Sequence, residues 1–190
     1  MIRKITGMSL LATAMLSLFP LACQPGGVGD PCTPEDEYNP EFSGYNVGES
    51  TAEARSFQCE TRLCLVDHFR GRVSCKYGQA APAAGADPST ANCKVPGDPD
   101  KAINKKVDAQ YLERQADKAV YCSCRCDGAD KNARYCKCPS GFACKDSIPN
   151  LGIGDAQLAG SYCIRNGSEY DASNAPTTTC TAPNCGANEG

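Results

Sequence analysis

The chain has little of what a protein needs to fold around an apolar core. It contains no tryptophan, and of the 168 residues from position 23 onward only 20 are Leu, Ile, Val or Phe, about 12%. That share lies below the ~20% that ordinary globular sequences exceed. A reduced chain of this composition should stay largely unfolded, so we expect another constraint to hold the fold together.

Catalytic signatures are scarce as well. His68 is the only histidine, and no Gly-x-Ser-x-Gly elbow accompanies it, so we expect a solvated surface residue. The acidic groups Glu35-Asp36-Glu37 and Asp98-Pro99-Asp100 could act as general acids and bases, but solvated charge is their commoner role. We therefore predict no catalytic residue and no enzyme. A secreted or surface hydrolase, or an inhibitor on the same scaffold, is the alternative.

Basic runs are missing too. The formal net charge is −3, and it becomes −5 if Arg3 and Lys4 are removed with the N-terminal segment. A net acidic chain without a basic patch is poorly suited to bind phosphate backbones. We expect no nucleic-acid partner.

Cysteine, in contrast, is abundant and odd in number, with fifteen residues. Setting Cys23 aside leaves fourteen, enough for seven disulfides of unassigned pairing: Cys32, Cys59, Cys64, Cys75, Cys93, Cys122, Cys124, Cys126, Cys136, Cys138, Cys144, Cys163, Cys180 and Cys185. Each disulfide typically stabilises by ~2–4 kcal/mol, mainly by restricting the unfolded chain. Zinc binding by the cysteines of 122–138 is the alternative. The chain has no Cys-x-x-Cys, however, so we predict disulfides with no metal or cofactor.

The N-terminal segment sets the compartment. Residues 1–22 begin with two positive charges and continue with an uncharged apolar run, Ile5 to Phe19. Fifteen helical residues reach about 22 Å, short of the ~30 Å hydrocarbon core, so we predict a signal peptide rather than a membrane span. The end of the segment, Leu21-Ala22-Cys23, resembles a lipobox, with Ala22 before the cut and Cys23 after it.

The lipobox resemblance implies that Cys23 is lipidated and anchors the protein in a membrane, where several acyl chains give stable attachment. Gln24 at the next position, in place of Asp, favours the outer membrane. We expect an exported protein on the periplasmic or surface face of the envelope. Simple secretion, with Cys23 as the first mature residue, is the alternative.

Composition divides the chain into segments that each hold an even number of cysteines. After the signal peptide 1–22 come a lipidated cysteine with a flexible spacer (23–31), a four-cysteine module (32–78), an Ala/Pro linker (79–92), an eight-cysteine module (93–165) and a polar tail with one cysteine pair (166–190). Each segment could close on its own disulfides. A single irregular domain is the alternative.

Local patterns predict a small disulfide-rich fold of mainly β hairpins with one short helix. Residues 63–67 and 72–77 alternate as two strands around a glycine-containing turn, and 121–126 with 135–144 form a second, sulfur-lined hairpin around the polar turn 127–134. Residues 50–53 match a capping box for one or two helical turns. Apolar spacing predicts a helix over 106–118.

The whole chain resembles the cysteine-rich exported lipoproteins of predatory and gliding δ-proteobacteria such as myxobacteria. The residues that carry the resemblance are Ala22-Cys23, Gly29-Asp30-Pro31-Cys32, Arg62 to Val66, Tyr121 to Cys126 and Tyr135 to Phe142. The resemblance implies a lipid-anchored envelope protein and brings no activity with it. Exposed tyrosines and short loops would suit contact with an envelope protein or a glycan.

Overall fold

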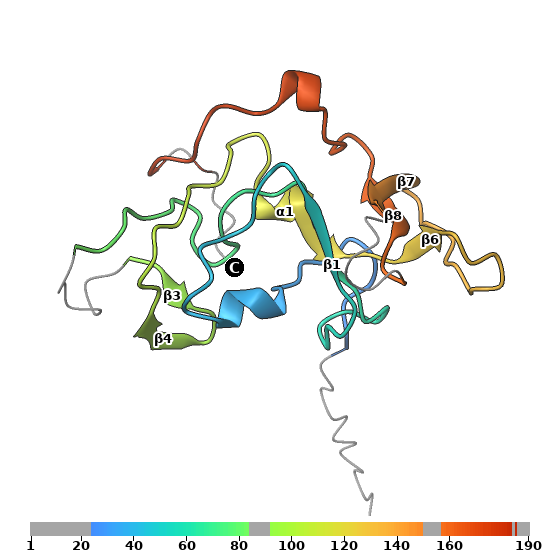
Figure 1. Cartoon of the computed structure of the whole chain (residues 1–190), viewed down its shortest axis with the longest axis horizontal. Coiled ribbons are helices and arrows are strands. Elements are labelled where there is room, and N and C mark those ends of the chain that lie inside the picture. The colour runs from blue at the N-terminus through green and yellow to red at the C-terminus, as the bar shows by residue number, and fades with distance from the viewer. Residues whose placement is uncertain (1–23, 84–91, 150–156, 184, 186–190) are drawn as a thin grey trace, which may run out of the picture.

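The computed structural model describes residues 24–83, 92–149, 157–183 and 185, which fold into short strands joined by long irregular segments (Figure 1). The predicted signal peptide, Cys23 and most of the Ala/Pro linker lie outside the described residues. The elements are η1 (Glu35–Tyr38), β1 (Ser50–Glu53), β2 (Cys64–Asp67), β3 (Lys94–Val95), β4 (Asp98–Ala102), α1 (Ala116–Ala119), β5 (Val120–Cys122), β6 (Arg125–Asp127), β7 (Phe142–Ile148), β8 (Gly160–Arg165) and η3 (Ala172–Asn174). The predicted fold class is confirmed.

The strands form three small antiparallel sheets in the described part of the chain. Their orders are β1-β2-β5, β3-β4 and β6-β8-β7. Strand β2 is central in the first sheet and is buried along its whole length. It pairs with β1 on one edge and with β5 on the other, so residues that lie far apart in the sequence meet here.

Alternation along β2 and β5 gives the central sheet two buried faces. Val66 and Val120 pack on one face with the sulfurs of Cys64 and Cys122. Leu65 and Tyr121 pack on the other face, against Tyr162 and Ile164 of β8 and Phe142 of β7. The predicted common face of Cys64 and Val66 is confirmed. A third group of buried side chains lies beside β3 and β4 and includes the Cys75–Cys93 disulfide.

Seven disulfides join the fourteen predicted cysteines. The pairs are Cys32–Cys64, Cys59–Cys122, Cys75–Cys93, Cys124–Cys136, Cys126–Cys144, Cys138–Cys163 and Cys180–Cys185. Two of them, Cys59–Cys122 and Cys75–Cys93, cross from 32–78 into 93–165. The expectation that these two segments close on their own cysteines is therefore wrong, because β2 pairs with β5 and brings them together. One irregular domain describes the structure better than two modules.

The spacer predicted over 24–31 is also wrong for most of its length. The Gly26 amide donates to the Gln58 carbonyl at 2.7 Å, and the Glu60 amide donates to the Gly26 carbonyl at 2.9 Å. Gly29, at φ +100°, donates to the Cys122 carbonyl and accepts from the Arg165 guanidinium. These bonds build 26–31 into the fold, so that of the described spacer residues only Gln24 and Pro25 lie before the first of these bonds.

The predicted helical turn over 50–53 is strand β1 instead. Its backbone pairs with β2, which supplies the hydrogen bonds that a cap would have supplied. The Ser50 hydroxyl donates to the Asp67 carboxylate at 2.9 Å, and Glu53 accepts the backbone amide of Glu35. Both side chains of the apparent capping box are thus used in long-range contacts.

The hairpin predicted between 63–67 and 72–77 does not form, because β1 and β5 occupy both edges of β2. Residues 72–78 form a turn in its place. The second predicted hairpin is wrong for a similar reason: β6 and β7 both pair with β8. Residues 135–138 are held by the Cys124–Cys136 and Cys138–Cys163 disulfides rather than by a ladder.

The helix predicted over 106–118 is reduced to α1, which covers four residues. Tertiary hydrogen bonds replace the missing helical ones. The backbones of Val107 and Gln79 pair in both directions, and the buried side chain of Gln110 donates to the Arg72 carbonyl at 2.8 Å. The helical spacing was a poor guide to burial as well, because Tyr111 and Leu112 are only half-buried, whereas the polar Gln110 and Arg114 are buried.

Two buried arginines hold the irregular segments in place. Arg72 pairs with Glu37, with both side chains 0% exposed and Nε 3.3 Å from Oε2, and its guanidinium donates to the carbonyls of Glu37, Asn39 and Phe42. Glu37 in turn accepts the Val73 amide and the Ser74 hydroxyl. The expectation of a solvated Glu35-Asp36-Glu37 run is therefore wrong for Glu37.

Arg114 forms a second buried ion pair and also contacts the segment that follows β8. Its Nη2 lies 2.7 Å from Oδ2 of Asp67, with both side chains less than a tenth exposed. The same guanidinium donates to the carbonyls of Asp67, His68 and Ser168. One side chain therefore joins the end of β2 to the segment that follows β8.

Replacing Arg72 by Met should destabilise the fold strongly, because it leaves the buried Glu37 carboxylate without its cation. Loss of one partner of a buried ion pair costs ~3–5 kcal/mol. Lys105→Met is the matched control, since Lys105 pairs with Glu41 on the surface at 2.8 Å and such pairs contribute at most ~1 kcal/mol. The measurement is denaturant unfolding with the disulfides intact. Equal losses of unfolding free energy in the two variants would contradict the assignment of Arg72 and Glu37 as a stabilising buried ion pair.

Candidate functional site

A surface cleft of about 540 Å³ opens between η1, the end of β1 and the loop 54–62. Its walls carry two aromatic rings, two carboxylates and two guanidinium groups among otherwise polar side chains. The residues are Thr33, Glu35, Tyr38, Glu53, Arg55, Ser56, Phe57, Gln58 and Arg62. A concave surface with a few convergent polar groups is the usual setting for a binding site.

The loop 54–62 keeps its shape through short-range bonds and one disulfide. The Ser56 amide donates to the Arg62 carbonyl at 3.1 Å, and the Arg62 amide donates to the Cys59 carbonyl at 2.9 Å. Arg62 lies in the left-handed region at φ +62°, which turns the chain sharply before β2. Cys59 ties the loop to β5 through Cys122.

The Gln58 side chain fixes the N-terminal segment against this loop. Its amide oxygen accepts the Thr33 amide at 3.0 Å, and its amide nitrogen donates to the Thr33 carbonyl at 2.8 Å. The Gln58 backbone carbonyl meanwhile accepts the Gly26 amide. The segment from Gly26 onward therefore lies beside the loop 54–62, one wall of the cleft.

Both aromatic rings of the cleft are exposed. Phe57 is 80% exposed and Tyr38 is 45% exposed; Tyr77, which lies outside the cleft, is 44% exposed. The Arg62 guanidinium carbon lies 4.3 Å from the centre of the Phe57 ring, within cation–π range. The contact orders a ring that otherwise has few neighbours.

The acidic wall of the cleft is partly desolvated. Oε2 of Glu53 accepts the Glu35 amide at 2.9 Å. Burial raises the pKa of Glu53 above the usual glutamate value, and the charges of Glu35 and Asp36 raise it further, while the Glu35 hydrogen bond acts in the opposite direction. The Ser56 hydroxyl is buried and has no hydrogen-bond partner among the described residues, which leaves one donor and acceptor uncompensated.

The structure separates the residues that the sequence singled out as possible catalysts. His68 is half-buried, with Nδ1 2.9 Å from the Val47 carbonyl oxygen and its ring stacked on Tyr170 at 4.2 Å. The expectation of a solvated histidine is therefore wrong. Asp98 and Asp100 are exposed on β4, as expected, and the Asp98 carboxylate accepts the Asp100 amide.

A second cleft, of about 490 Å³, lies over β6, β7 and β8 and contains two aspartates. The hydrogen bond from Lys131 lowers the pKa of Asp127. Asp146 accepts the Ser161 hydroxyl at 2.5 Å. Both aspartates of this cleft are thus engaged by partners within the chain.

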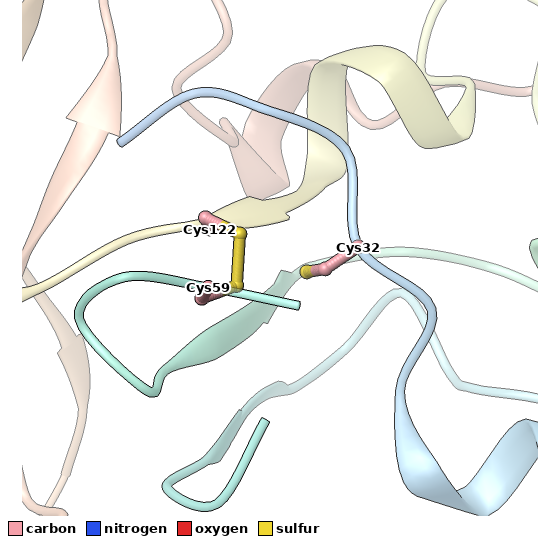
Figure 2. A group of neighbouring side chains, drawn as sticks. All are labelled: Cys32, Cys59 and Cys122. Carbon is pink, nitrogen blue, oxygen red and sulfur yellow. A yellow bond between two sulfur atoms is a disulfide. The ribbon is translucent and has the colours of Figure 1, made fainter. Parts of the chain in front are cut away.

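Nine cysteine sulfurs gather in three groups of metal-site dimensions: Cys32, Cys59 and Cys122; Cys124, Cys136 and Cys163; Cys126, Cys138 and Cys144. Figure 2 shows the first group, where the Cys32 sulfur points toward the Cys59–Cys122 bond. All nine sulfurs belong to disulfides. Metal ions need thiolate ligands, and a disulfide offers none. The groups are therefore stacked disulfides.

Comparisons of the chain with protein-family models, with curated proteins and with solved structures gave no match. None of the helices in the described ranges has the length and apolarity of a transmembrane span.

Sequence reasoning missed the cleft. Its residues come from 33–38 and 53–62, and no short motif links the two stretches. Arg55 and Phe57 beside Cys59 form the one local signal, an exposed charge and ring next to a fixed point of the chain. The pairing of Gln58 with Thr33 that closes the wall is a tertiary contact.

Glu53→Gln should stabilise the protein more at pH 7 than at pH 4. Folded Glu53 holds its proton more tightly than the unfolded chain does, so wild-type stability falls as the pH rises from the unfolded to the folded pKa. Glutamine does not titrate, so the substitution removes this loss of stability with rising pH. Glu60→Gln, which removes a charge from an exposed position of the adjoining turn, is the matched control. Thermal unfolding from pH 4 to pH 7 measures both, and a Glu53→Gln effect that does not change with pH would contradict the assignment.

Proposed function

We propose that this protein is a lipid-anchored, disulfide-stabilised cell-envelope protein with a non-enzymatic binding role, exported and held at the outer membrane through Cys23. The cleft between η1 and the loop 54–62 is its binding surface. The resemblance to the exported lipoproteins of gliding bacteria agrees with this assignment.

The cysteine pairing supports the anchor. Fourteen cysteines are used in seven disulfides, which leaves Cys23 as the one cysteine of the chain outside them. Abundant disulfides are typical of proteins outside the cytoplasm. A thiol directly after a signal peptide, and not needed for the fold, is available for a thioether bond to lipid.

The chemistry of the cleft supports a binding role and carries the proposal. Carboxylates accept hydrogen bonds, the tyrosine hydroxyl can donate one, and its exposed ring stacks on flat apolar faces. Glu35, Glu53 and Tyr38 offer these three modes within one concavity. The combination suits a ligand rich in hydroxyl groups.

A glycan is therefore the partner that we propose, ahead of an envelope protein. A stable protein interface buries about 800 Å² on each side and is centred on clustered apolar side chains. Among the described residues, the exposed large apolar side chains are Tyr38, Phe57 and Tyr77. They are too few for such an interface but enough for one or two sugar rings.

The anchor predicts that wild-type protein fractionates with membranes and that its N-terminal peptide carries acyl groups on Cys23. Cys23→Ala should move the protein to the soluble fraction, because the acyl chains supply the membrane affinity. Gln24→Ala, at the next position, keeps the thiol and should stay in the membrane. Mass spectrometry and fractionation measure both. A Cys23→Ala protein that remains with the membrane would exclude the anchor.

The cleft predicts binding to cell-wall glycan, with isolated peptidoglycan as the probe. Tyr38→Ala should weaken co-sedimentation about fivefold, since a stacked ring contributes ~1 kcal/mol. Tyr77→Ala removes an equally exposed tyrosine outside the cleft and should leave binding unchanged. Equal effects from the two variants, or no sedimentation of the wild type, would refute the glycan assignment.

A further inference from the structure

The folded body begins very close to the proposed lipid. Gly26 is hydrogen-bonded to Gln58 and Glu60, so the three residue steps from Gly26 back to Cys23 span at most about 10 Å. A tether of this length cannot hold the body away from a bilayer surface. The part of the protein nearest to Gly26 must therefore lie at that surface.

The part nearest to Gly26 is the loop 54–62, and its chemistry suits a membrane interface. Phe57 is the most exposed large apolar side chain of the described residues, at 80%. Arg62 stacks on its ring, and Arg55 lies two residues before it. An aromatic ring at the acyl boundary with guanidinium groups at headgroup depth is a common arrangement of interfacial anchors.

The charge of this loop differs from that of the whole chain. The loop 54–62 contains two arginines and one glutamate, whereas the chain from residue 23 onward carries −5. Anionic headgroups attract the arginines of the loop and repel the net negative charge of the chain. The short tether determines which face meets the lipid, and Arg55 and Arg62 are the groups of this loop that headgroup phosphates can bind beside the carboxylates of the cleft.

We propose that the loop 54–62 is a membrane-contact surface, in which Phe57 enters the bilayer interface and Arg55 and Arg62 lie among lipid phosphates. This inference rests on the lipid anchor proposed above. It deepens that proposal by fixing which face of the body meets the membrane. The cleft, whose rim includes Phe57, then opens along the membrane surface.

The absence of tryptophan allows a direct test. Phe57→Trp puts a single fluorophore in the loop, and Tyr77→Trp puts one at a partly exposed position beside a different group of buried side chains. Each acylated variant is reconstituted into vesicles of phosphatidylethanolamine and phosphatidylglycerol with brominated acyl chains. We expect a blue shift and at least about twofold quenching for Trp at 57, and little change at 77.

The controls separate failure of this inference from failure of the anchor. Acylated protein that binds the vesicles without selective quenching at position 57 would overturn the membrane-contact surface and leave the anchor standing. Blue-shifted emission that rises with protein density and is not quenched by brominated lipid would place a second copy on the loop, and would also overturn it. Wild-type protein without acyl groups would overturn both proposals.

As a further arm, Arg55→Gln with Arg62→Gln should reduce quenching of Trp at 57 when phosphatidylglycerol is present. The effect should shrink in vesicles of phosphatidylcholine alone, because anionic headgroups supply the attraction. An equal reduction in the two kinds of vesicle would overturn the role of the arginines. The paired lipid compositions serve as the control, since any effect of the substitutions on the fold is the same in both kinds of vesicle.

Discussion

The Cys59–Cys122 disulfide is the constraint on which the rest of this structure depends. It closes 63 residues of sequence and holds the loop 54–62 against β5, while Cys32–Cys64 beside it holds the N-terminal segment against β2. With so few aliphatic side chains, the chain cannot offset its conformational entropy by burial alone. The two disulfides stabilise the fold by reducing the entropy of the unfolded chain, which the few apolar contacts could not offset alone. The central sheet can then consist of strands of three and four residues.

Buried charge is the second substitute for an apolar core. Arg72 and Arg114 each satisfy several backbone carbonyls that belong to no strand or helix. A buried carbonyl that lacks a donor costs about as much as a lost hydrogen bond, and irregular segments leave more carbonyls without a regular partner. A guanidinium, with five N–H groups in a plane, can serve several loops at once where a lysine could not. This explains why the loops hold one arrangement although they lack regular pairing.

Local sequence was informative where strand alternation decides which side chains share a face, and misleading where it predicted hairpins and helices. The alternation at Cys64 and Val66 correctly placed both side chains on one face, because strand geometry alone decides that. The capping box at Ser50 failed because Ser50 and Glu53 have better partners in Asp67 and Glu35, far away in the sequence. The even number of remaining cysteines predicted how many disulfides form but not which cysteines pair, because many pairings use all of them. The cleft depends on the contact of Gln58 with Thr33, which has no sequence signature.

The same disulfide that stabilises the fold also determines how the protein can meet its surroundings. Because Cys59 fixes the loop to the core and Gln58 fixes the N-terminal segment to the loop, Gly26 and the loop that carries the exposed Phe57 ring belong to one part of the fold. A protein on a long linker samples all orientations, and its binding surface faces the membrane only part of the time. A protein held by two free residues has little such freedom. If Cys23 carries lipid, the orientation of the cleft is therefore a property of the fold itself, and any ligand of the cleft must be reached along the membrane plane.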